Sequence, residues 1–341
     1  MKRVLIVKTS SLGDVIHTLP ALTDAVNNIS DIQFDWVIEH SFADIASWHS
    51  SVSEVIPVKV RQWRNSPLKT LRSQEWSSFR AQIKSRSYDA VIDAQGLIKS
   101  ALLLPFTNGP RFGMDKHSVR ESIASYFYDQ KFAIPRDQHA VERTRQLFAK
   151  SLGYAVPDSI GNYKIRSQFS DSNIEPYVVF LHGTTWQSKH YPENYWSDLI
   201  ALAEQHSFRV KLLWGNDLEY CRAEQLASKS KACEVMPRLS LAEIAELLVK
   251  ATGAIAVDTG LGHLAAAVDC PTVSLFMSTN PGWSGAYGKS QKHLAVKFPC
   301  APCMKRDCPL QSINDQIRPP CASTISPGYV WNSFLELTQS L

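Results

Sequence analysis

The feature that most constrains the fold is an alternation of strand-like and helical patterns that occurs twice along the chain. Short apolar runs, each followed by a helical pattern, are typical of strand–helix–strand units with parallel strands. The first half predicts strands over 4–7, 34–38 and 90–92 and helices over 19–27 and 80–85. The second half predicts strands over 177–181, 210–214, 254–257 and 272–276 and helices over 195–205, 217–228, 241–249 and 263–268. The sequence therefore predicts an α/β protein of two doubly wound, Rossmann-like domains that face each other across a cleft.

A polar segment with Pro157, Gly161 and Pro176 separates the two halves and predicts a linker over 156–176. We expect an N-terminal domain over 1–155 and a C-terminal domain over 177–325. The last segment, 326–341, carries a helical pattern over 329–337, and one arrangement open to this helix is to cross back to the N-terminal domain.

Composition agrees with a folded chain. The 341 residues are 44% hydrophobic and 20% charged, which is ordinary for globular proteins and sufficient for two domains. No stretch reaches the roughly 18 to 20 apolar residues of a membrane-spanning helix, and the first apolar run is too short for a signal peptide. We therefore expect a cytoplasmic protein.

Positive charge is concentrated between residues 61 and 86. Glu75 is the one acidic residue there, against the basic residues Arg61, Arg64, Lys69, Arg72, Arg80, Lys84 and Arg86. Trp63, Trp76 and Phe79 lie among these charges. Arginine binds phosphates and carboxylates and tryptophan favours the membrane boundary, so the segment suits an anionic, lipid-borne partner. A solvated helix face explains it equally well. Nucleic acid is disfavoured, because no module for DNA or RNA is present.

The first strand runs directly into a polar loop that ends in Gly13 and Asp14, just before a helix. Open α/β sheets bind ligands at the carboxyl ends of their strands, so a carboxylate here is a candidate for chemistry. Considered alone, Asp14 is equally well explained as a helix cap.

Two loops of the second half have the chemistry of phosphate binding. Thr184, Thr185 and Lys189 follow one strand, and Asp258, Thr259, Gly260 and His263 follow another at the start of a small-residue helix. Hydroxyls, a lysine and the unpaired amides of a helix N-terminus suit a diphosphate. Asp258-Thr259-Gly260 does not indicate an aspartic protease, which needs a second copy in an all-β fold. Asp258 as a helix cap remains an alternative.

Glu219, at the start of a further helix, fits either a dipole-complementing carboxylate or an acceptor for ribose hydroxyls.

Four cysteines near the end have the spacing C-x2-C-x4-C-x12-C: Cys300, Cys303, Cys308 and Cys321. This spacing fits a structural zinc, a disulfide-stapled loop, or reduced thiols. A cytoplasmic location argues against disulfides.

These motifs together resemble those of the ADP-heptose:lipopolysaccharide heptosyltransferases, glycosyltransferase family 9. The resemblance rests on the run from Lys8 to Leu22, on residues 139–143, on Thr184 and Thr185 with Lys189 and His190, and on residues 258–263. It extends over essentially the whole chain and is closest to the type I enzymes, which add the first heptose to the Kdo of lipid A. It implies a GT-B fold, inverting transfer without a metal or other cofactor, and donor binding in the C-terminal domain.

The resemblance also implies roles for residues. Asp14 is the expected catalytic base, and Lys189 assists departure of ADP. The donor-binding set is Thr184, Thr185, Lys189, Glu219 at the ribose, Leu239 at the adenine, Asp258 at heptose hydroxyls, Thr259, Gly260 and His263. The acceptor-binding set, chosen for capture of the anionic Kdo, which carries a phosphate in some acceptors, is Ser10, Arg61, Arg64, Lys99, Arg120, His139 and Arg143. We expect peripheral contact with the cytoplasmic face of the inner membrane of a Gram-negative bacterium.

Three other functions remain open at this point. The cysteines resemble insertions found in type II enzymes, which add the second heptose to the inner core. The two-domain architecture and diphosphate loops also suit a GT-B sugar-nucleotide epimerase, which needs no acceptor. The non-enzyme alternative is a nucleotide-sensing or membrane-docking module with a vestigial cleft.

Overall fold

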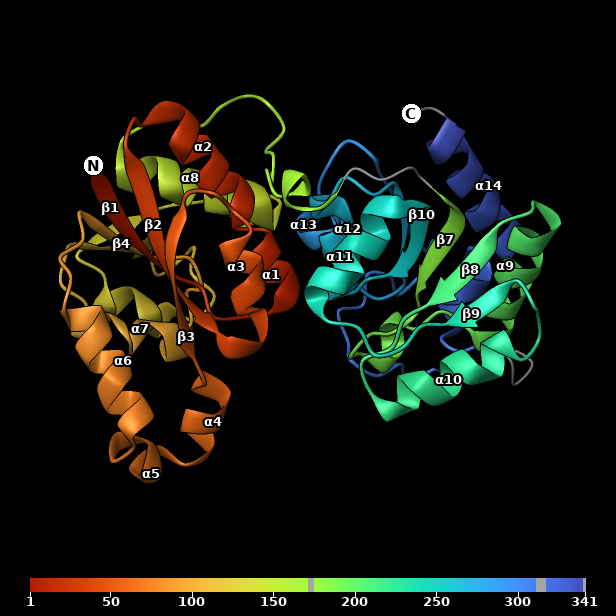
Figure 1. The fold of residues 1–341 in the computed structure, drawn as a ribbon, viewed down its shortest axis with the longest axis horizontal. Helices are drawn as coiled ribbons and strands as arrows, with labels where there is room; N and C mark the ends of the chain where they lie inside the picture. Colours follow the sequence, from red (N-terminus) through yellow and green to blue (C-terminus); the bar gives the residue numbers. More distant parts are fainter. Residues whose placement is uncertain (171–174, 311–316, 340–341) are drawn as a thin grey trace. The chain divides into compact units, whose positions relative to one another are not determined.

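The computed structural model describes residues 1–170, 175–310 and 317–339 (Figure 1). It divides into two compact units, Met1–Ile165 and Arg166–Leu341. The division falls inside the expected linker, so that residues 156–165 belong to unit 1 and residues 166–176 to unit 2.

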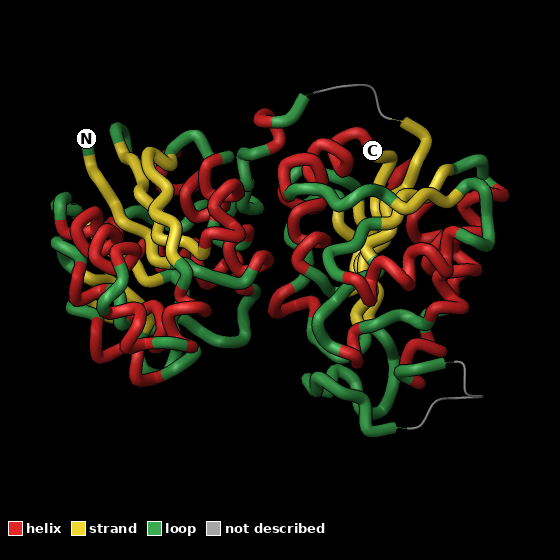
Figure 2. Tube along the Cα trace, turned by 60° about the horizontal axis from the view of Figure 1, so that its bottom comes forward, coloured by secondary structure: helices red, strands yellow, loops and turns green. Residues whose placement is uncertain are grey.

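Unit 1 is a parallel sheet in the order β3-β2-β1-β4-β5-β6, with helices on both sides of the strands (Figure 2). Its strands are β1 (Lys2–Val7), β2 (Ile32–Glu39), β3 (Val52–Val58), β4 (Ala90–Asp93), β5 (Arg111–Met114) and β6 (Gln130–Phe132). Its helices are α1 (Leu12–Ile16), α2 (Leu19–Asn28), α3 (Ala43–Ser47), α4 (Val60–Asn65), α5 (Pro67–Leu71), α6 (Gln74–Lys84), α7 (Ile98–Ala101) and α8 (Ala140–Leu152). Val4, Leu5, Ile6 and Val7 are fully buried, as expected for a central strand covered on both faces.

Unit 2 repeats this plan in the order β12-β11-β10-β7-β8-β9. Its strands are β7 (Glu175–Leu181), β8 (Arg209–Leu212), β9 (Cys233–Val235), β10 (Ala251–Val257), β11 (Thr272–Phe276) and β12 (Gln291–Ala295). Its helices are α9 (Glu193–Gln205), α10 (Asp217–Ala227), α11 (Leu241–Lys250), α12 (Gly260–Ala267), α13 (Pro281–Ser284) and α14 (Pro327–Gln339). A core of Val178, Phe180, Trp196, Ile255 and Leu275 lies between sheet and helices.

In each sheet, the chain order reverses next to the first strand. The first strand of unit 1, β1, lies between β2 and β4, and the first strand of unit 2, β7, lies between β8 and β10. Loops that follow such neighbouring strands meet at the carboxyl edge of the sheet, where doubly wound proteins bind ligands. The loop before Asp14 and the loops at residues 183–190 and 258–260 occupy these two switch points.

The predicted strands are present, with shifted ends, and several further strands were missed. The strand expected over 210–214 ends at Leu212, and the helix expected over 80–85 is the last part of α6. Strands β5, β6 and β9 are only three or four residues long, too short for a periodic pattern. Strand β3 contains Glu54 and Pro57, which interrupt the apolar pattern by which a strand is predicted. It lies at the edge of the sheet and pairs on one side with β2.

Helix α14 packs in unit 2, against α9 and strands β10, β11 and β12. Its apolar face buries Val330, Trp331 and Phe334 in the core of that unit. Gly253 permits the contact, because a Cβ atom there would lie 2.8 Å from Phe334 Cε2. A contact of this helix with the first domain stays a prediction. In the described residues, no helix combines the length and apolarity that crossing a membrane requires.

Candidate active site

Asp14 lies in the first turn of α1, where its two carboxylate oxygens have different partners. Oδ2 accepts hydrogen bonds from the backbone N–H and the hydroxyl of Ser11, both at 3.0 Å. Oδ1 accepts from Arg120 Nη2 at 3.1 Å. The helix-cap interpretation therefore fits Oδ2, which takes part in a capping box with Ser11, while Oδ1 is paired with an arginine whose side chain is 57% exposed. The two interpretations of Asp14 are compatible.

The charges around Asp14 keep it ionised. Burial by itself would raise the pKa of this carboxyl, but the positive charges of Lys8 and Arg120, with the Ser11 N–H, outweigh burial and hold its pKa well below the usual range. Lys8 is buried and donates to the carbonyl of Ala94 at 2.9 Å, and burial lowers the pKa of its ammonium group. A carboxylate in this environment is an acceptor for a hydroxyl proton donor at neutral pH.

Further cations converge on the same edge of unit 1. Lys99 Nζ donates to the buried Ser10 hydroxyl. Burial lowers the pKa of Lys99, and the positive charges of Arg61 and Arg64, both exposed on α4, lower it further. These four predicted residues are thus near one another. The set is rich in positive charge, which suits an anionic ligand.

The other two predicted acceptor residues support neighbouring structure. His139 Nδ1 accepts from the N–H of Val141 at 3.2 Å and so caps α8, and its ring lies 5.3 Å from that of His17. Arg143 Nε donates to the carbonyl of Pro135 at 2.9 Å, and its Nη2 donates to the carbonyl of Ser118. Its guanidinium therefore fixes the segment that leads to Arg120. These bonds give Arg143 a positioning role, and its expected contact with the acceptor stays a prediction.

In unit 2, the loop at residues 183–190, here the donor loop, contacts the end of β10 through an ion pair. Lys189 Nζ lies 2.7 Å from Asp258 Oδ2, and the same oxygen accepts from Thr279 Oγ1 at 2.6 Å. Thr184 Oγ1 donates to the backbone carbonyl of Asp258 at 3.0 Å. Thr185 is exposed on the same loop. The pair is well covered, with 16% of the lysine side chain and 7% of the aspartate exposed.

Asp258 is not the N-cap residue of the helix that follows it, because that helix, α12, begins one residue too late. Thr259 is the N-cap residue of α12, and in the described chain its side chain makes no capping hydrogen bond. The amides of the first turn, beginning at Gly260, therefore meet no capping hydroxyl. His263 follows within the helix and is buried. Such an N-terminus is suited to an anionic group.

Glu219 lies directly beside the donor loop. Its Oε2 accepts from the N–H of Gly215 at 2.8 Å, and a Cβ atom at Gly183 would come within 2.6 Å of its Oε1. Glycine at position 183 is thus what allows this carboxylate to approach the loop. Leu239, half-buried, precedes α11, and the structure does not show a direct contact that defines its role.

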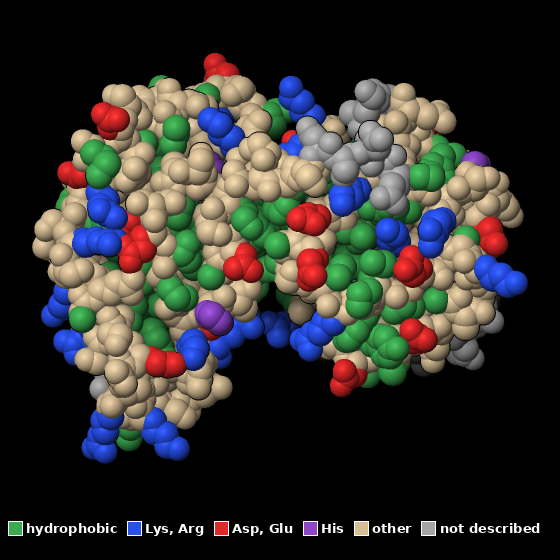
Figure 3. All heavy atoms as spheres, in the orientation of Figure 1, with side chains coloured by type: hydrophobic (Ala, Val, Ile, Leu, Met, Phe, Trp, Pro, Cys, Tyr) green, Lys and Arg blue, Asp and Glu red, His purple; other side chains and the backbone are tan. Residues whose placement is uncertain are grey.

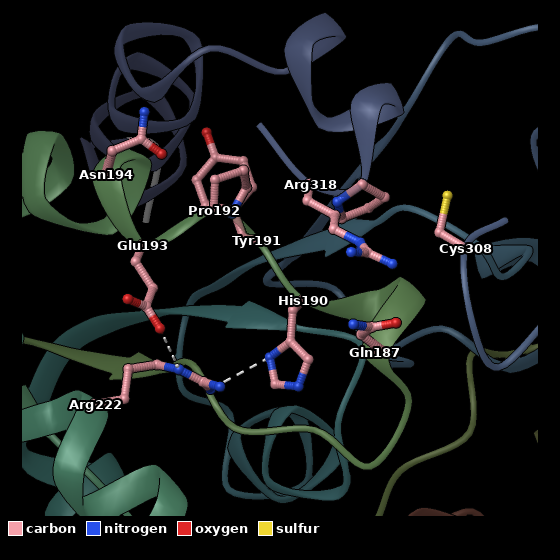
Figure 4. Close-up of a pocket in the computed structure, with 10 residues that line it drawn as sticks. Gln187, His190, Tyr191, Pro192, Glu193, Asn194, Arg222, Cys308 and Arg318 are labelled. Carbon is pink, nitrogen blue, oxygen red and sulfur yellow. Dashed lines mark hydrogen bonds and ion pairs between the residues drawn. The ribbon is translucent and has the colours of Figure 1, made fainter. Parts of the chain in front are cut away.

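A pocket of about 510 Å³ adjoins the donor loop (Figure 4). Gln187 and His190 come from the loop, Arg222 from α10, and Cys308 and Arg318 from the chain further on. Arg222 is held by Glu193 at 3.2 Å and by His190 Nδ1 at 3.3 Å. Burial, followed by the positive charge of Arg222, lowers the pKa of His190 to about 4. The imidazole is therefore neutral at pH 7 and can accept from the guanidinium.

The four clustered cysteines form no disulfide with one another. Cys300, Cys303, Cys308 and Cys321 are all free thiols. Burial raises the pKa of Cys321 to about 12, and the neighbouring thiols of the other three add to the effect. The four thiols are therefore near one another, but among the described residues no three ligating side chains are grouped closely enough to hold a metal ion. Among the described residues the four cysteines stand as free thiols, and a structural zinc stays a prediction.

The basic segment of unit 1 differs from expectation in its aromatic residues. Trp76 and Phe79 are buried, and Trp63 packs on both with ring centroids 5.2 and 5.5 Å away. Trp76 and Phe79 therefore belong to the core, and Trp63 is half-buried against it. What remains exposed at the tip formed by α4 and α5 is basic, with Leu68 76% exposed among the charges (Figure 3).

Some residues at these sites were missed by sequence reasoning. Gln95 Oε1 accepts from the N–H groups of Thr9 and Ser10 at 3.0 and 2.9 Å and shapes the loop before Asp14. Thr279 holds Asp258. Gln95 lies just after β4 and Thr279 just after β11, near the switch points of the two sheets. This position at the carboxyl end of a strand was the sequence signal that could have identified them.

Comparisons with known proteins indicate the family. The model of glycosyltransferase family 9 (heptosyltransferase) matches residues 76–314. The chain is 54% identical over 312 residues to lipopolysaccharide heptosyltransferase 1 of Pseudomonas aeruginosa, which covers 91% of this chain and 88% of that protein. The structure of E. coli heptosyltransferase WaaC with ADP is similar at a TM-score of 0.85 and 43% identity, covering 98% of this chain and 99% of that one. That of E. coli ADP-heptose lps heptosyltransferase II has a TM-score of 0.76 at 17% identity, covers 100% and 99%, and shows likeness of fold alone.

Proposed function

Because this chain belongs to glycosyltransferase family 9, the heptosyltransferases, we propose that it transfers L-glycero-D-manno-heptose from ADP-heptose to the Kdo of Kdo-lipid A, with or without a phosphate on that Kdo. The GT-B fold of two doubly wound units agrees with the predicted fold class. The observation that carries the proposal is Asp14, an ionised carboxylate at the switch point of unit 1 with one oxygen paired with an exposed arginine.

The proposed reaction is a single displacement. The acceptor hydroxyl attacks the anomeric carbon of the heptose as the bond to ADP breaks, so the configuration at that carbon inverts. Asp14 accepts the proton of the hydroxyl. Its low pKa makes it a weak base while it is paired with Arg120. When an anionic group of the acceptor takes over Arg120, the carboxylate loses a positive neighbour and becomes a stronger base.

Departure of ADP is assisted by groups of unit 2. Lys189, the hydroxyls of Thr184 and Thr185, and the amides at the start of α12 are positioned before charge develops, which is the condition for effective electrostatic stabilisation. This set provides the positive charge that a divalent cation supplies at other diphosphate sites. We therefore propose that transfer needs no metal.

The acceptor is assigned to unit 1 because its cations converge there. Arg61 and Arg64 both act electrostatically on Lys99, whose ammonium group donates to the Ser10 hydroxyl. The Kdo carboxylate and any phosphate suit such a cluster. The exposed basic tip at α4 and α5, with Leu68, supports peripheral contact with the cytoplasmic face of the inner membrane, where anionic headgroups attract basic residues.

A transfer assay read by mass spectrometry tests the proposal. Purified protein is incubated with ADP-heptose and Kdo-lipid A, its phosphorylated form, or heptosylated core, each with and without EDTA. We expect one heptose to be added to the first two acceptors at rates that EDTA does not change. Transfer to heptosylated core alone would assign the second heptose instead. Isomerisation of the donor without any acceptor would indicate the epimerase alternative.

A further inference from the structure

The loop that carries the first three cysteines, residues 300–308, is fastened to the donor loop at Ser188. This serine is buried, and its N–H donates to the carbonyl of Arg306 at 3.0 Å. Its hydroxyl donates to the carbonyl of Lys305 and lies 2.9 Å from Ser278 Oγ. The N–H of Met304 donates in turn to the carbonyl of Ser278 at 2.8 Å. The cysteine loop thus has a fixed position against the donor loop.

This attachment places a second cation against the aromatic residue of the donor loop. Lys189 Nζ lies over the Trp186 ring at 4.6 Å from its centroid, and Arg306 Cζ lies over the same ring at 5.7 Å. A ring of this kind stabilises a nearby cation through its negative faces. Two cations that share one ring nevertheless repel each other, and a bound anion would relieve that repulsion.

The two cations differ in how far they are already neutralised. Lys189 is paired with Asp258 at 2.7 Å. For Arg306, no ion pair with a carboxylate is found within the described residues, and its side chain is exposed. A departing ADP carries more negative charge than one paired lysine can balance. Arg306 is the additional cation that the fold holds beside Lys189.

We propose that Arg306 is a further donor-binding residue, whose guanidinium contacts the diphosphate of the sugar nucleotide and stabilises the charge on departing ADP. This inference rests on the proposed function and extends its donor site by one residue. It also assigns a task to the cysteine loop, which is to hold that arginine in place.

The test compares Arg306→Ala with Lys305→Ala in the full-length protein. Lys305 is the neighbouring exposed cation on the same loop, so its removal changes the net charge equally without removing the cation over Trp186. Binding of ADP, AMP and adenosine is measured by isothermal titration calorimetry, and steady-state transfer is measured for both substrates. Arg306→Lys is included to restore charge without the bidentate geometry.

We expect Arg306→Ala to weaken ADP binding about tenfold, AMP less and adenosine hardly at all, because the lost contact is to phosphate. The kcat/KM for ADP-heptose should fall by at least that factor, with partial recovery in Arg306→Lys and less than a twofold change in Lys305→Ala. Equal losses for ADP and adenosine would show a merely structural role, and unchanged ADP affinity would also overturn the inference. If the wild-type protein bound no ADP and transferred no heptose, the proposed function itself would be wrong.

Discussion

The donor and acceptor half-sites use charge in different ways. In unit 2, Lys189 and Asp258 form a mostly buried pair, fixed further by Thr279, at the ends of central strands. In unit 1, the partner of Asp14 is Arg120, which is largely exposed. Arg61 and Arg64 lie on the short helix α4, and Lys99 lies on α7. The Lys189–Asp258 pair of the donor half-site is largely covered and neutralised, whereas Arg61, Arg64 and Arg120 carry the positive charge of the acceptor half-site on exposed side chains.

The difference matches two kinds of ligand. A sugar nucleotide is one small molecule of fixed shape, so a preorganised site lowers the cost of binding it. A lipid-linked sugar acid presents charges that vary with its phosphorylation, and long exposed side chains can adapt to them. We therefore expect substitutions in unit 2 to impair donor binding and departure, and those in unit 1 to impair proton transfer or acceptor binding.

Replacing Asp14 tests this separation most severely. Asp14→Ala should lower kcat about 1,000-fold, within the usual range for loss of a general base, while the Kd for ADP stays within twofold. Steady-state kinetics and calorimetry measure the two effects. Asp44→Ala, which removes a carboxylate from the first turn of α3, is the control and should leave kcat unchanged. Transfer near the original rate by Asp14→Ala would disprove the base assignment.

Removing Lys189 should have the next largest effect and should fall on the donor. Lys189→Ala should lower kcat/KM for ADP-heptose about 100-fold, because a positive group is lost where charge develops and Asp258 is left unpaired. The KM for the acceptor should not change.

A double-mutant cycle with Asp258→Asn separates these two causes. If the effect of Lys189→Ala comes mainly from breaking the pair with Asp258, the kcat/KM for ADP-heptose should be little lower in the double variant than in Lys189→Ala alone. An acceptor KM that rose with the donor KM would show that the half-sites are not independent.

The strand pattern locates the predicted donor residues more directly than the predicted acceptor residues, for a physical reason. Lys189, Thr184 and Asp258 directly follow buried strands, so the strand pattern itself locates them at one edge of a sheet. Trp186 and Arg306, by contrast, are brought together by the bonds of Ser188 between segments more than a hundred residues apart. No local pattern encodes such a contact.

In unit 1, the signals available from composition were ambiguous. Trp63 and Trp76 lie among arginines in the sequence. A helix buries one face and exposes the other, so the two rings pack together towards the core while the charged side chains are exposed. Arg143 is as basic as Arg120, but its guanidinium is used by backbone carbonyls. Only the folded geometry separates a positioning arginine from an exposed one.

The contribution of Arg120 should appear in the pH dependence. Because its positive charge helps to depress the pKa of Asp14, Arg120→Ala should raise that pKa towards the ordinary value, near 4. The acidic limb of the kcat/KM profile should move to higher pH, and the acceptor KM should rise about tenfold. Ionised Asp14 stabilises the fold at pH values above the pKa that this carboxyl has in the unfolded chain, and this stabilisation is lost as the pH falls. Arg120→Ala should therefore lose less stability on acidification than the wild-type protein.

A pH-rate profile and acid unfolding curves measure both effects, with Arg120→Lys expected to restore part of each. An unchanged acidic limb would mean that Lys8 alone sets the ionisation of Asp14.

The smallest effect is expected from the exposed cations of α4. The double variant Arg61→Ala and Arg64→Ala should raise the acceptor KM about threefold to tenfold at low salt, and less at high salt, because exposed charges are screened. The Kd for ADP should not move. Lys69→Ala with Arg72→Ala is the matched control, since it removes the same charge from the neighbouring turn of the tip. The contradicting outcome is that both double variants raise the acceptor KM equally on vesicles and that neither raises it with a soluble Kdo acceptor. The α4 cations would then serve membrane contact. The acceptor half-site would be confined to Lys99 and Arg120.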